Sequence, residues 1–516
     1  MTAEFSDIAG QAWRLAGSSS SLDGALTVTG PRAVLPAFFD VTGLATASVA
    51  AATLAAAEFL AARDGSGEVR PVTVDSRAAC AAFACEGLFT PIGWSVPSIW
   101  DPIAGNYLAR DGWIRLHTNY AYHRDAVERV LGVGEQDAVR AAVREWKAAD
   151  LETAVVEAGG CAAAMRTRAD WLASAAGAAT AGTLPLRVRE RAMADGGRGP
   201  TVVREKRPEP AGRAEGSVAP FAGVRVLDLT RVIAGPVCTR FLAAYGADVL
   251  RLDPPGFAEV PALLPETTAG KRTAAVDLTT TVGRETFQEL AGTADVLVAG
   301  LRGDALARLG YDDAALSALN PALIIASLNA YGWDGPWRNR RGFDSLAQMS
   351  CGIAAAGTGS ADKRSAGRDK PLPLPVQALD HATGFLLAAA VGRALTRRLN
   401  CSTVSRIHAS LVGTANFLWS LPGPGGQPPM PGRGEFPLED TTTEWGPARR
   451  VPLPGRIAGI VPGWGIEAGP LGRHEPSWAR LFRCPYGGAA GNLRACRAAS
   501  TGLPRRVRTS PPGTTR

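Results

Sequence analysis

The sequence lacks the clustered cysteines and histidines of a metal site. Its eight cysteines stand singly, no Cys-x-x-Cys pair occurs, and no histidine lies near two cysteines at ligand spacing. We therefore predict no metal. Isolated cysteines in a chain of 516 residues are typical of a reducing compartment, so we expect a cytoplasmic protein whose cysteines mostly pack in the core.

Signals for a membrane or for nucleic acid are also missing. The opening MTAEFSDIAGQAWRLAG has no basic stretch before an apolar one, which predicts no signal peptide. The longest apolar run, residues 42–63, is alanine-rich and interrupted by polar residues, so we expect a buried helix and no membrane partner. The net charge of +7 falls largely in residues 484–516, and the rest of the chain has no basic stripe with aromatics, which predicts no nucleic-acid partner.

The glycine patterns of common cofactor sites are absent as well. The first strand-to-helix turn of the α/β region reads RVIAGPVCT, with one glycine where a dinucleotide site needs three, and no GxxxxGK[ST] occurs. No GxSxG nucleophile elbow follows a strand. These absences disfavour NAD, P-loop nucleotides and a serine nucleophile, and we predict no permanently bound cofactor.

Composition divides the chain into segments. Residues 1–195 alternate alanine-rich helical patterns with short strand-like runs, and residues 196–219 combine Gly, Pro and both charge signs, which predicts a linker. Residues 220–420 alternate apolar strands with helices. Residues 421–483 are rich in Pro and Gly, and residues 484–516 contain arginine but no acidic residue, which predicts a disordered tail.

The region from residue 220 has the pattern of an α/β fold. VRVLDLT (224–230) and DVLRLD (248–253) have the composition of buried parallel strands, and the helix between them has Pro236 in its first turn and Gly246 at its end. Further apolar strands alternate with helices to about residue 400. We predict a doubly wound parallel, Rossmann-like sheet domain.

An internal repeat relates two alanine-rich helices. Residues 38–63 resemble residues 378–399, and each is followed by a short strand-like stretch and a second alanine-rich helix. When the two are aligned on their Thr-Gly pairs, Phe39 stands in the first copy where the second has Asp380. The alignment predicts a partial duplication whose first copy lacks this carboxylate, and the family resemblance given below implies that this copy also lacks a sheet.

Asp380 begins the second of these helices, in LPVQALDHATG. From the residues alone it suits a helix N-cap, a buried ion pair or a catalytic carboxylate. Cations near the turns of the α/β region are each typical of a solvated surface, yet together they suit a polyphosphate held by charge-assisted hydrogen bonds. They are Lys271, Arg272, Arg302 and Arg341.

Several motifs of the α/β region occur in an order known from one family. They are GVRVLDLTRVIAGP, GKRTAAVDL, ADVLVAGLRGD, LNPALIIASLNAYG, GFDSLAQM and VQALDHATG. The set resembles the family III CoA-transferases, which include formyl-CoA and carnitine CoA-transferases and the related α-methylacyl-CoA racemases. The upstream YLARDGWIRLHTNYAYH resembles the small domain of that family. The resemblance implies a Rossmann-like sheet domain with a smaller α+β domain, and a homodimer.

The resemblance also implies roles for single residues. The nucleophilic aspartate of the family falls on Asp380, and Lys271 and Arg272 match a cationic turn that meets the CoA phosphates. Arg341 falls where formyl-CoA transferases have a CoA-contacting lysine, and Arg302 belongs to the same expected CoA-binding set. The active-site strand end of the family falls on Arg231, Val232, Ile233 and Ala234. The chain departs from the family at ENFRPG, which is AGLRGD here, so Gly300 and Leu301 replace an Asn and a Phe.

The implied activity is CoA transfer between an acyl-CoA and a carboxylic acid through an aspartyl anhydride and an aspartyl thioester. Racemases of the family resemble GHD where this chain has GFD, and Phe343 in place of that second base favours transfer. Two alternatives are an acyl-CoA racemase or isomerase, and a non-catalytic CoA-binding paralogue. His381 is expected to be a packing neighbour, and His117 and His123 are expected to be structural.

Overall fold

A computed structural model describes residues 3–17, 24–193, 219–358 and 370–478. The predicted tail 484–516 and nearly all of the predicted linker 196–219 lie outside the described residues. Residues Met1–Ala479 form one compact unit. The finer domain boundaries that composition indicates stay a prediction.

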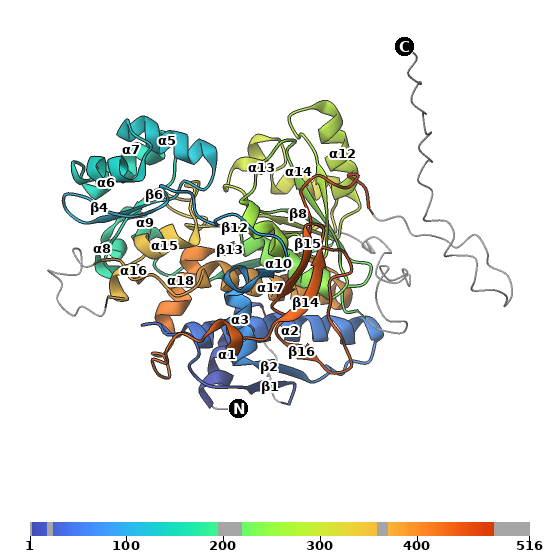
Figure 1. Ribbon diagram of the computed structural model, residues 1–516. Helices are drawn as coiled ribbons and strands as arrows, with labels where there is room; N and C mark the ends of the chain where they lie inside the picture. The colour runs from blue at the N-terminus through green and yellow to red at the C-terminus, as the bar shows by residue number, and fades with distance from the viewer. Residues whose placement is uncertain (1–2, 18–23, 194–218, 359–369, 479–516) are drawn as a thin grey trace, which may run out of the picture. The chain divides into compact units, whose positions relative to one another are not determined.

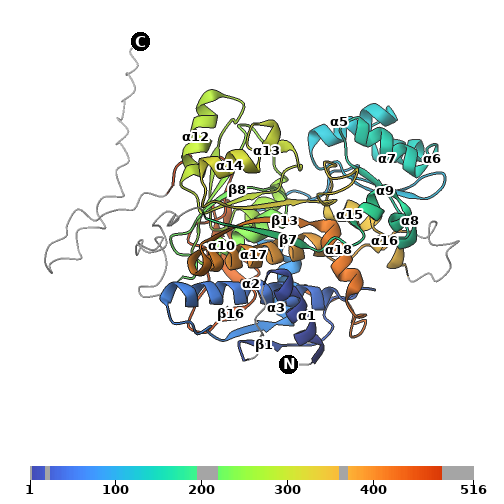
Figure 2. The same ribbon diagram turned by 180° about the vertical axis from the view of Figure 1, so that it is seen from behind.

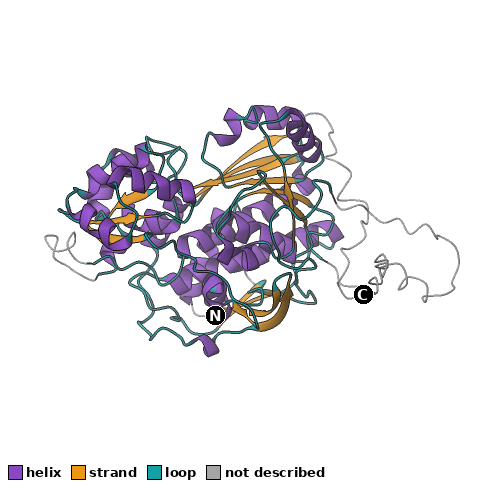
Figure 3. Cartoon of the chain, turned by 45° about the horizontal axis from the view of Figure 1, so that its top comes forward, coloured by secondary structure: helices purple, strands orange, loops and turns teal. Residues whose placement is uncertain are grey.

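A seven-stranded sheet forms the centre of this unit (Figure 3), with the order β10-β9-β8-β11-β12-β13-β7. All neighbours are parallel except β7, which runs antiparallel to β13 at the edge. Because β7 precedes the predicted linker, the segment 1–195 contributes a strand to this sheet. The strands are β7 (Leu186–Ala192), β8 (Arg225–Leu229), β9 (Asp248–Asp253), β10 (Lys271–Ala275), β11 (Val296–Ala299), β12 (Ile324–Asn329) and β13 (Thr403–Ser410).

Alternate residues of the strands feed two hydrophobic cores, as the period of two in a strand requires. Val226 and Val298 belong to a core with helices α10 and α17, whereas Leu227 and Leu297 belong to a core with α12 and α14. The apolar strands predicted from the sequence are therefore buried on both faces. The helices of this region are α10 (Ala234–Ala244), α11 (Leu264–Thr267), α12 (Thr281–Gly292), α13 (Ala305–Arg308), α14 (Asp313–Leu319), α15 (Asp344–Ser350), α16 (Ile353–Ala356), α17 (Ala378–Cys401) and α18 (Leu411–Ser420), with a 3-10 turn at Pro261–Leu263.

The N-terminal region repeats part of this architecture. Strands β1 and β2 pair in parallel, and β2 leads directly into α3, as β12 pairs with β13 and β13 leads into α18. With β16 they form a three-stranded sheet, so the expectation that the first copy lacks a sheet was wrong. The elements are α1 (Ala3–Leu15), β1 (Leu26–Thr29), α2 (Val41–Asp64), β2 (Val72–Asp75), α3 (Ser76–Phe83), α4 (Cys85–Leu88) and β16 (Arg456–Ile457).

Helices α2 and α17 are the repeated pair, and both contain 24 residues. Asp40 and Gln377, which precede them, share the same backbone geometry (φ −76°, ψ 68° and φ −75°, ψ 62°). Gly65 and Ser402 end them in the left-handed region at the same residue offset. This register differs by about one helical turn from the Thr-Gly alignment and places Gly43, not Phe39, opposite Asp380. The first copy lacks the carboxylate in either register.

The two repeated helices pack against each other (Figure 1). A Cβ on Gly392 of α17 would lie 3.0 Å from Cβ of Ala55, so glycine permits the close crossing. Helix α2 is long and apolar enough to cross a membrane by length and composition, and 94% of its most apolar window is buried in the structure. The predicted buried helix is confirmed.

A small α+β region lies between the repeated elements in the sequence. Its sheet has the order β4-β5-β6 with antiparallel pairs, which agrees with the strand predicted at DGWIRLHT. The region lies beside α15 and α16 in two opposite views (Figures 1 and 2). Its elements are β4 (Gly105–Leu108), β5 (Trp113–Leu116), α5 (Ala121–Leu131), α6 (Gln136–Arg144), α7 (Ala148–Glu157), β6 (Ala162–Ala164), α8 (Arg168–Ala173) and α9 (Ala175–Thr180).

The Pro/Gly-rich segment after residue 421 contains more regular structure than its composition indicates. Strands β14 and β15 form an antiparallel hairpin, and β15 also pairs with β3 from the N-terminal region. Pairing to an existing strand therefore gives order that local periodicity does not predict. The elements are β3 (Thr90–Pro91), a 3-10 turn at Arg433–Glu435, β14 (Glu439–Thr443) and β15 (Gly446–Arg450).

Candidate active site

A cavity of about 260 Å³ lies at the carboxyl ends of β8, β11 and β12. The loops that follow these strands supply Val232, Leu301 and Ala330 to its wall. Between β8 and β11 the order of strands reverses direction along the chain, and open α/β sheets bind ligands at such a point. The main-chain arrangement therefore provides a candidate ligand site without the glycine fingerprint that the sequence lacks.

Asp380 lies in the first turn of α17 and lines this cavity. Gly384, one turn later, brings α17 against α10, because a Cβ there would lie 2.5 Å from the carbonyl oxygen of Ala234. Asp380 is 7% exposed, and within the described part of the chain no hydrogen bond to its carboxylate is found. The helix-cap interpretation of Asp380 was wrong, since the N-cap residue is Gln377 and it caps nothing with its side chain.

The backbone of the first turn is instead held by a carboxylate from another helix. The N–H of Asp380 donates to Oδ2 of Asp344 at 2.9 Å, and Gln348 donates to Oδ1 of the same side chain. Burial raises the pKa of Asp344 to about 6. Burial, and next the negative charges of Asp344 and Glu86, raise the pKa of Asp380 well above its usual range. A carboxylate with increased basicity thus faces the cavity.

The loop from Arg231 to Ala234, which the resemblance assigned to the active site, lines the cavity as expected. Val232 has φ of 62°, which is rare for a β-branched residue and marks local strain. Its N–H donates to Glu259 Oε2 at 3.2 Å, and the hydroxyl of Tyr120 donates to Oε1 at 2.6 Å. A buried carboxylate therefore holds the strained loop in place.

Three of the predicted CoA-binding cations are brought together at the cavity. Arg231, Arg302 and Arg341 all line it. The Arg231 guanidinium stacks 3.6 Å from the ring centroid of Phe257 and lies 3.7 Å from Asp253. Arg341 donates to the carbonyl of Gly159 at 3.2 Å. Ile233 and Ala234 also line the cavity, beside the N-terminus of α10.

Lys271 and Arg272 are not at the cavity. Both belong to β10 rather than to a turn before it, and the Lys271 side chain is fully buried. Its Nζ lies 2.9 Å from Asp228 Oδ2 and donates to the carbonyl of Pro236 at 3.3 Å. Arg272 pairs with Asp248 at 2.7 Å. The predicted phosphate contact of these residues was wrong, because both side chains form ion pairs within the fold.

The small α+β region supplies residues that the sequence did not single out as functional. Tyr120, Tyr122 and His123 line the cavity, and so does Arg340 from the sheet region. Burial, and next the charge of Arg341, lower the pKa of His123 to about 4. His117 does not line the cavity and stacks on Phe343 with ring centroids 3.7 Å apart. The aromatic run NYAYH could have indicated a cavity wall, but the spacing of its residues does not show which of their side chains face a cavity.

A second cavity of about 350 Å³ shares Ile233 with the first. Val376 and Gln377, just before α17, also line it, so it lies on the other side of the same helix end. Further apolar side chains form most of its wall, and all but one of them come from the N-terminal and C-terminal segments; Leu263 belongs to the sheet region. They are Phe83, Leu88, Ile99, Trp100, Leu263, Met430 and Phe436.

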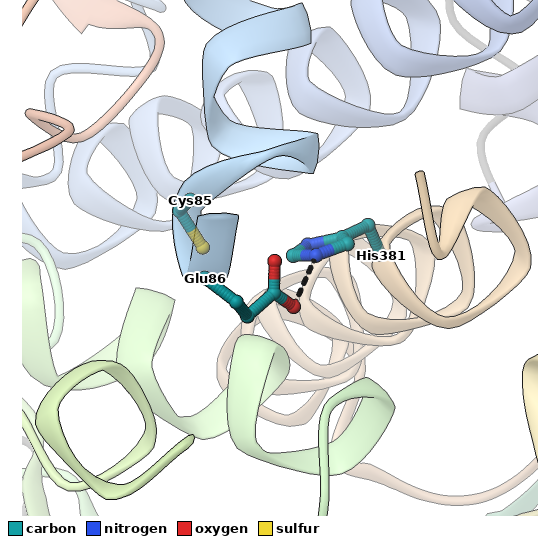
Figure 4. Close-up of side chains that lie close together, drawn as sticks. All are labelled: Cys85, Glu86 and His381. Carbon is teal, nitrogen blue, oxygen red and sulfur yellow. Dashed lines mark hydrogen bonds and ion pairs between the residues drawn. The ribbon is translucent and has the colours of Figure 1, made fainter. Parts of the chain in front are cut away.

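His381, next to Asp380, points away into a buried cluster with Glu86 and Cys85 (Figure 4). Its Nε2 lies 2.8 Å from Oε1 of Glu86. These three side chains have the donor types of a metal site, with donor atoms within 4.8 Å of one another. The Arg240 guanidinium lies 3.7 Å from the Cys85 sulfur, and burial raises the pKa of that thiol to about 12. A cation adjoining an uncharged thiol disfavours a metal ion there.

Comparison with known proteins identifies the family of this part of the chain. Residues 221–421 match the sequence model of CoA-transferase family III. This segment belongs to CoA-transferase family III. The resemblance inferred from its motifs is confirmed, and Asp380, Arg302 and Arg341 all lie within the matched family III segment.

Several family III relatives are similar over this part of the chain. The probable fatty acyl-CoA transferase Rv3272 of Mycobacterium tuberculosis is 34% identical over 192 residues, which are 35% of this chain and 47% of the relative. The formyl-CoA:oxalate CoA-transferase of Rhodopseudomonas palustris is 32% identical over 201 residues, 37% of this chain and 45% of the relative. The chain therefore spans about half the length of the curated relatives it matches.

Solved structures show the same partial overlap. The crystal structure of Rv3272 from M. tuberculosis, orthorhombic form, aligns with 31% identity and a TM-score of 0.35 over 40% of this chain and 58% of that chain. A CAIB/BAIF family protein from Brucella suis aligns with 25% identity and a TM-score of 0.34 over 44% of this chain and 65% of that chain.

Proposed function

We propose that the protein moves CoA between an acyl-CoA and a carboxylic acid, with Asp380 as the nucleophile. The observation that carries the proposal is a buried carboxylate of raised pKa that faces a cavity lined by four arginines. Membership of the segment 221–421 in family III supports it. The two-core packing and strand order support a doubly wound assignment of the sheet.

The cavity at the sheet suits the phosphates of CoA. Arg231, Arg302 and Arg341 supply positive charge without a P-loop, and guanidinium groups bind phosphate by charge-assisted hydrogen bonds. The uncapped N-terminus of α10 adds a partial positive charge beside Ala234. Here Gly300 and Leu301, which replace the Asn and Phe of related sequences, also line the wall. Their replacement leaves the arginines as the main polar contacts for phosphate.

The apolar cavity suits the acyl group. It shares Ile233 with the cationic cavity and adjoins the residues before α17, so a thioester carbonyl near Asp380 has a cationic cavity on one side and an apolar cavity on the other. Burial of an alkyl chain there is favourable by about 0.8 kcal/mol per methylene. We infer an apolar acyl group or acid as one of the two substrates.

The chemistry follows from the position of the carboxylate. An Asp380 oxygen attacks the thioester carbonyl carbon, the C–S bond breaks, and CoA leaves as a thiolate from a mixed anhydride. The thiolate attacks the aspartyl carbonyl, which releases the donor acid as its carboxylate and forms an aspartyl thioester. The acceptor carboxylate and the thiolate repeat the two steps in reverse order and regenerate Asp380. The buried helix behind Asp380 limits the water that would hydrolyse the anhydride.

The deciding experiment traps the aspartyl intermediate. The purified full chain is incubated with acetyl-, octanoyl- and succinyl-CoA, treated with hydroxylamine, and mapped by peptide mass spectrometry. We expect a hydroxamate at Asp380 and loss of transfer in Asp380→Asn by more than about a thousandfold. Asp304→Asn, a carboxylate outside the cavity, serves as the matched control. A hydroxamate on another residue, or transfer that survives in Asp380→Asn, overturns the proposal.

A second candidate is proton exchange at the α-carbon of an acyl-CoA, as in a racemase. His123 lines the same cavity as Asp380, and its lowered pKa of about 4 keeps it a neutral base at pH 7. Phe343 occupies the position where the racemase motif has its histidine, which counts against this candidate. Deuterium uptake at the α-carbon in D₂O without CoA transfer would favour it, and its abolition in His123→Gln would assign the base.

A further inference from the structure

The hydrogen bond and the ring contact found for the His381 side chain in the described part of the chain both come from the N-terminal repeat. His381 is fully buried, its Nε2 lies 2.8 Å from Glu86 Oε1, and its ring stacks on Phe83 with centroids 5.2 Å apart. Phe83 ends α3 and Glu86 lies in α4, which are elements of the copy that lacks a carboxylate of its own. Figure 4 shows Glu86 pointing from its short helix to the first turn of α17.

Glu86 also supplies a negative charge that acts on Asp380. Asp344 and Glu86 act on the Asp380 carboxyl, and burial is the largest influence on it. From the cavity side it faces Arg231, Arg302, Arg340 and Arg341, together with His123 and Tyr120. Glu86 itself lines the second cavity and faces His381, Arg240 and Cys85. Burial acts to raise its pKa, but its interactions with His381, with the backbone and with Arg240 together lower it. Glu86 therefore remains a carboxylate at neutral pH.

We propose that Glu86 is a positioning residue that the N-terminal repeat supplies to Asp380. Its carboxylate fixes the first turn of α17 through His381, and its negative charge opposes the ionisation of the nucleophile. The second copy performs the reaction, and the first copy anchors and tunes it. The kinetic test of this inference rests on the proposed function. The inference itself concerns how Glu86 acts on Asp380 and does not depend on which reaction Asp380 performs.

A purely structural role is the alternative, and the chain offers a matched control. Glu58 of α2 forms an ion pair with Arg393 of α17, so it also ties the first copy to the catalytic helix. Arg393 lies more than three turns after Asp380. Glu58→Gln and Glu86→Gln thus each break one pair between the same two copies, and only Glu86→Gln removes charge near Asp380.

The test compares the pH dependence of kcat/KM in these variants. Asp380 must be ionised to attack, so removing a nearby negative charge moves the acid limb of the profile to lower pH, by roughly one unit in Glu86→Gln. Glu86→Asp, which keeps the charge, retains an acid limb close to that of the wild type, and Glu58→Gln leaves the limb in place. Equal profiles for Glu86→Gln and Glu58→Gln overturn the proposal.

A second measurement does not depend on turnover. The rate at which a carbodiimide modifies Asp380, followed by peptide mass spectrometry against pH, reports the protonation of that carboxyl. The midpoint falls in Glu86→Gln and is unchanged in Glu58→Gln. If the wild type transfers no CoA, the proposed function fails while this titration still decides the role of Glu86.

Hydrogen exchange tests whether Glu86 positions the first turn of α17. Glu86→Asp shortens the side chain and weakens the contact to His381, so amides of the first turn of α17 lose protection. In Glu58→Gln the loss falls near Arg393 instead. Unchanged protection of the first turn in Glu86→Asp would show that Glu86 does not position it, even if Glu86→Gln fails to fold.

Discussion

The backbone N–H of Asp380 donates a 2.9 Å hydrogen bond to Oδ2 of Asp344. Two buried carboxyl groups thus meet at the N-terminus of one helix, one as the acceptor for its backbone and one facing the cavity. Burial raises the pKa of both, and the charge of Asp344 further disfavours ionisation of Asp380, because like charges in a site of low polarity raise a pKa. The motif GFD and the motif LDHATG, which are separate in the sequence, act as one unit in the fold.

Replacing Asp344 by Asn is expected to shift the pH profile of CoA transfer. The change removes one negative charge beside Asp380, so the pKa of Asp380 falls and the acid limb of kcat/KM moves to lower pH. The measurement is the rate of transfer between pH 4 and 8 at saturating and limiting acyl-CoA. Asp304→Asn is the control, and a limb that stays in place would contradict the coupling between the two carboxyls.

The same pair predicts how stability depends on pH. The pKa of Asp344 is raised from 3.8 to about 6 in the folded protein, so the folded state binds more protons than the unfolded state between these values. Stability from this group is present below about pH 4 and is lost as pH rises through about 6, by about 3 kcal/mol. Urea unfolding measures the free energy of unfolding of the wild type and of Asp344→Asn. The wild type should lose stability relative to Asp344→Asn as the pH rises from about 4 to above 6, and a difference that does not depend on pH would refute the prediction.

Truncating Arg302 to Ala is expected to weaken acyl-CoA binding. Loss of one guanidinium contact to phosphate costs about 1.5–3 kcal/mol, so KM rises by roughly 10-fold to 100-fold while kcat changes little. Arg308, in the helix that follows, does not line the cavity and pairs with Asp304 on the surface. Arg308→Ala should leave KM unchanged. Equal KM values in the two variants would remove Arg302 from the binding site.

Filling the apolar cavity is expected to change the preference for acyl length. In the wild type, kcat/KM should rise by about fourfold for each methylene until the cavity is full. Met430 lines this cavity and is 49% exposed, so Met430→Trp should fold and should reduce transfer from octanoyl-CoA but not from acetyl-CoA. Val461→Trp, at an exposed site outside the cavity, is the control. A uniform response to both acyl groups would place the acyl chain elsewhere.

Replacing Lys271 by Met is expected to destabilise the fold without altering KM. The variant removes the ion pair of the buried Asp228, which keeps only its hydrogen bonds from Thr230 and Thr239. Loss of a buried ion pair costs about 3–5 kcal/mol, and adding Asp228→Asn should restore most of this loss. Thermal unfolding and transfer kinetics measure the two effects separately. If KM in the double variant rose as much as in Arg302→Ala, the result would show that Lys271 contributes to phosphate binding.

Much of the local structure could be predicted because it depends on short patterns. Asp248–Asp253 forms β9 with the bounds that its apolar run indicates, and residues 42–63 form a buried helix. The motif around Asp380 predicted the candidate nucleophile, but it did not predict that Asp344 accepts the hydrogen bond from the backbone N–H of Asp380. The spacing of residues around Asp380 does not predict a hydrogen bond to a side chain 36 residues away.

Other features depended on contacts between distant parts of the chain. Lys271 has the sequence context of a surface cation, but the fold places it against Asp228, 43 residues away. Glu86 reaches His381 across 295 residues, and Tyr120 reaches Glu259 across 139. No local periodicity encodes such pairs.

By itself the sequence determined the α/β pattern, the repeat and the candidate nucleophile, since each depends on residues close together in the chain. Tertiary structure decided which cations face the cavity, which register relates the two copies, and which side chains surround Asp380. The physical reason is burial: whether a charge is paired or open to a ligand depends on neighbours that only the folded chain brings together.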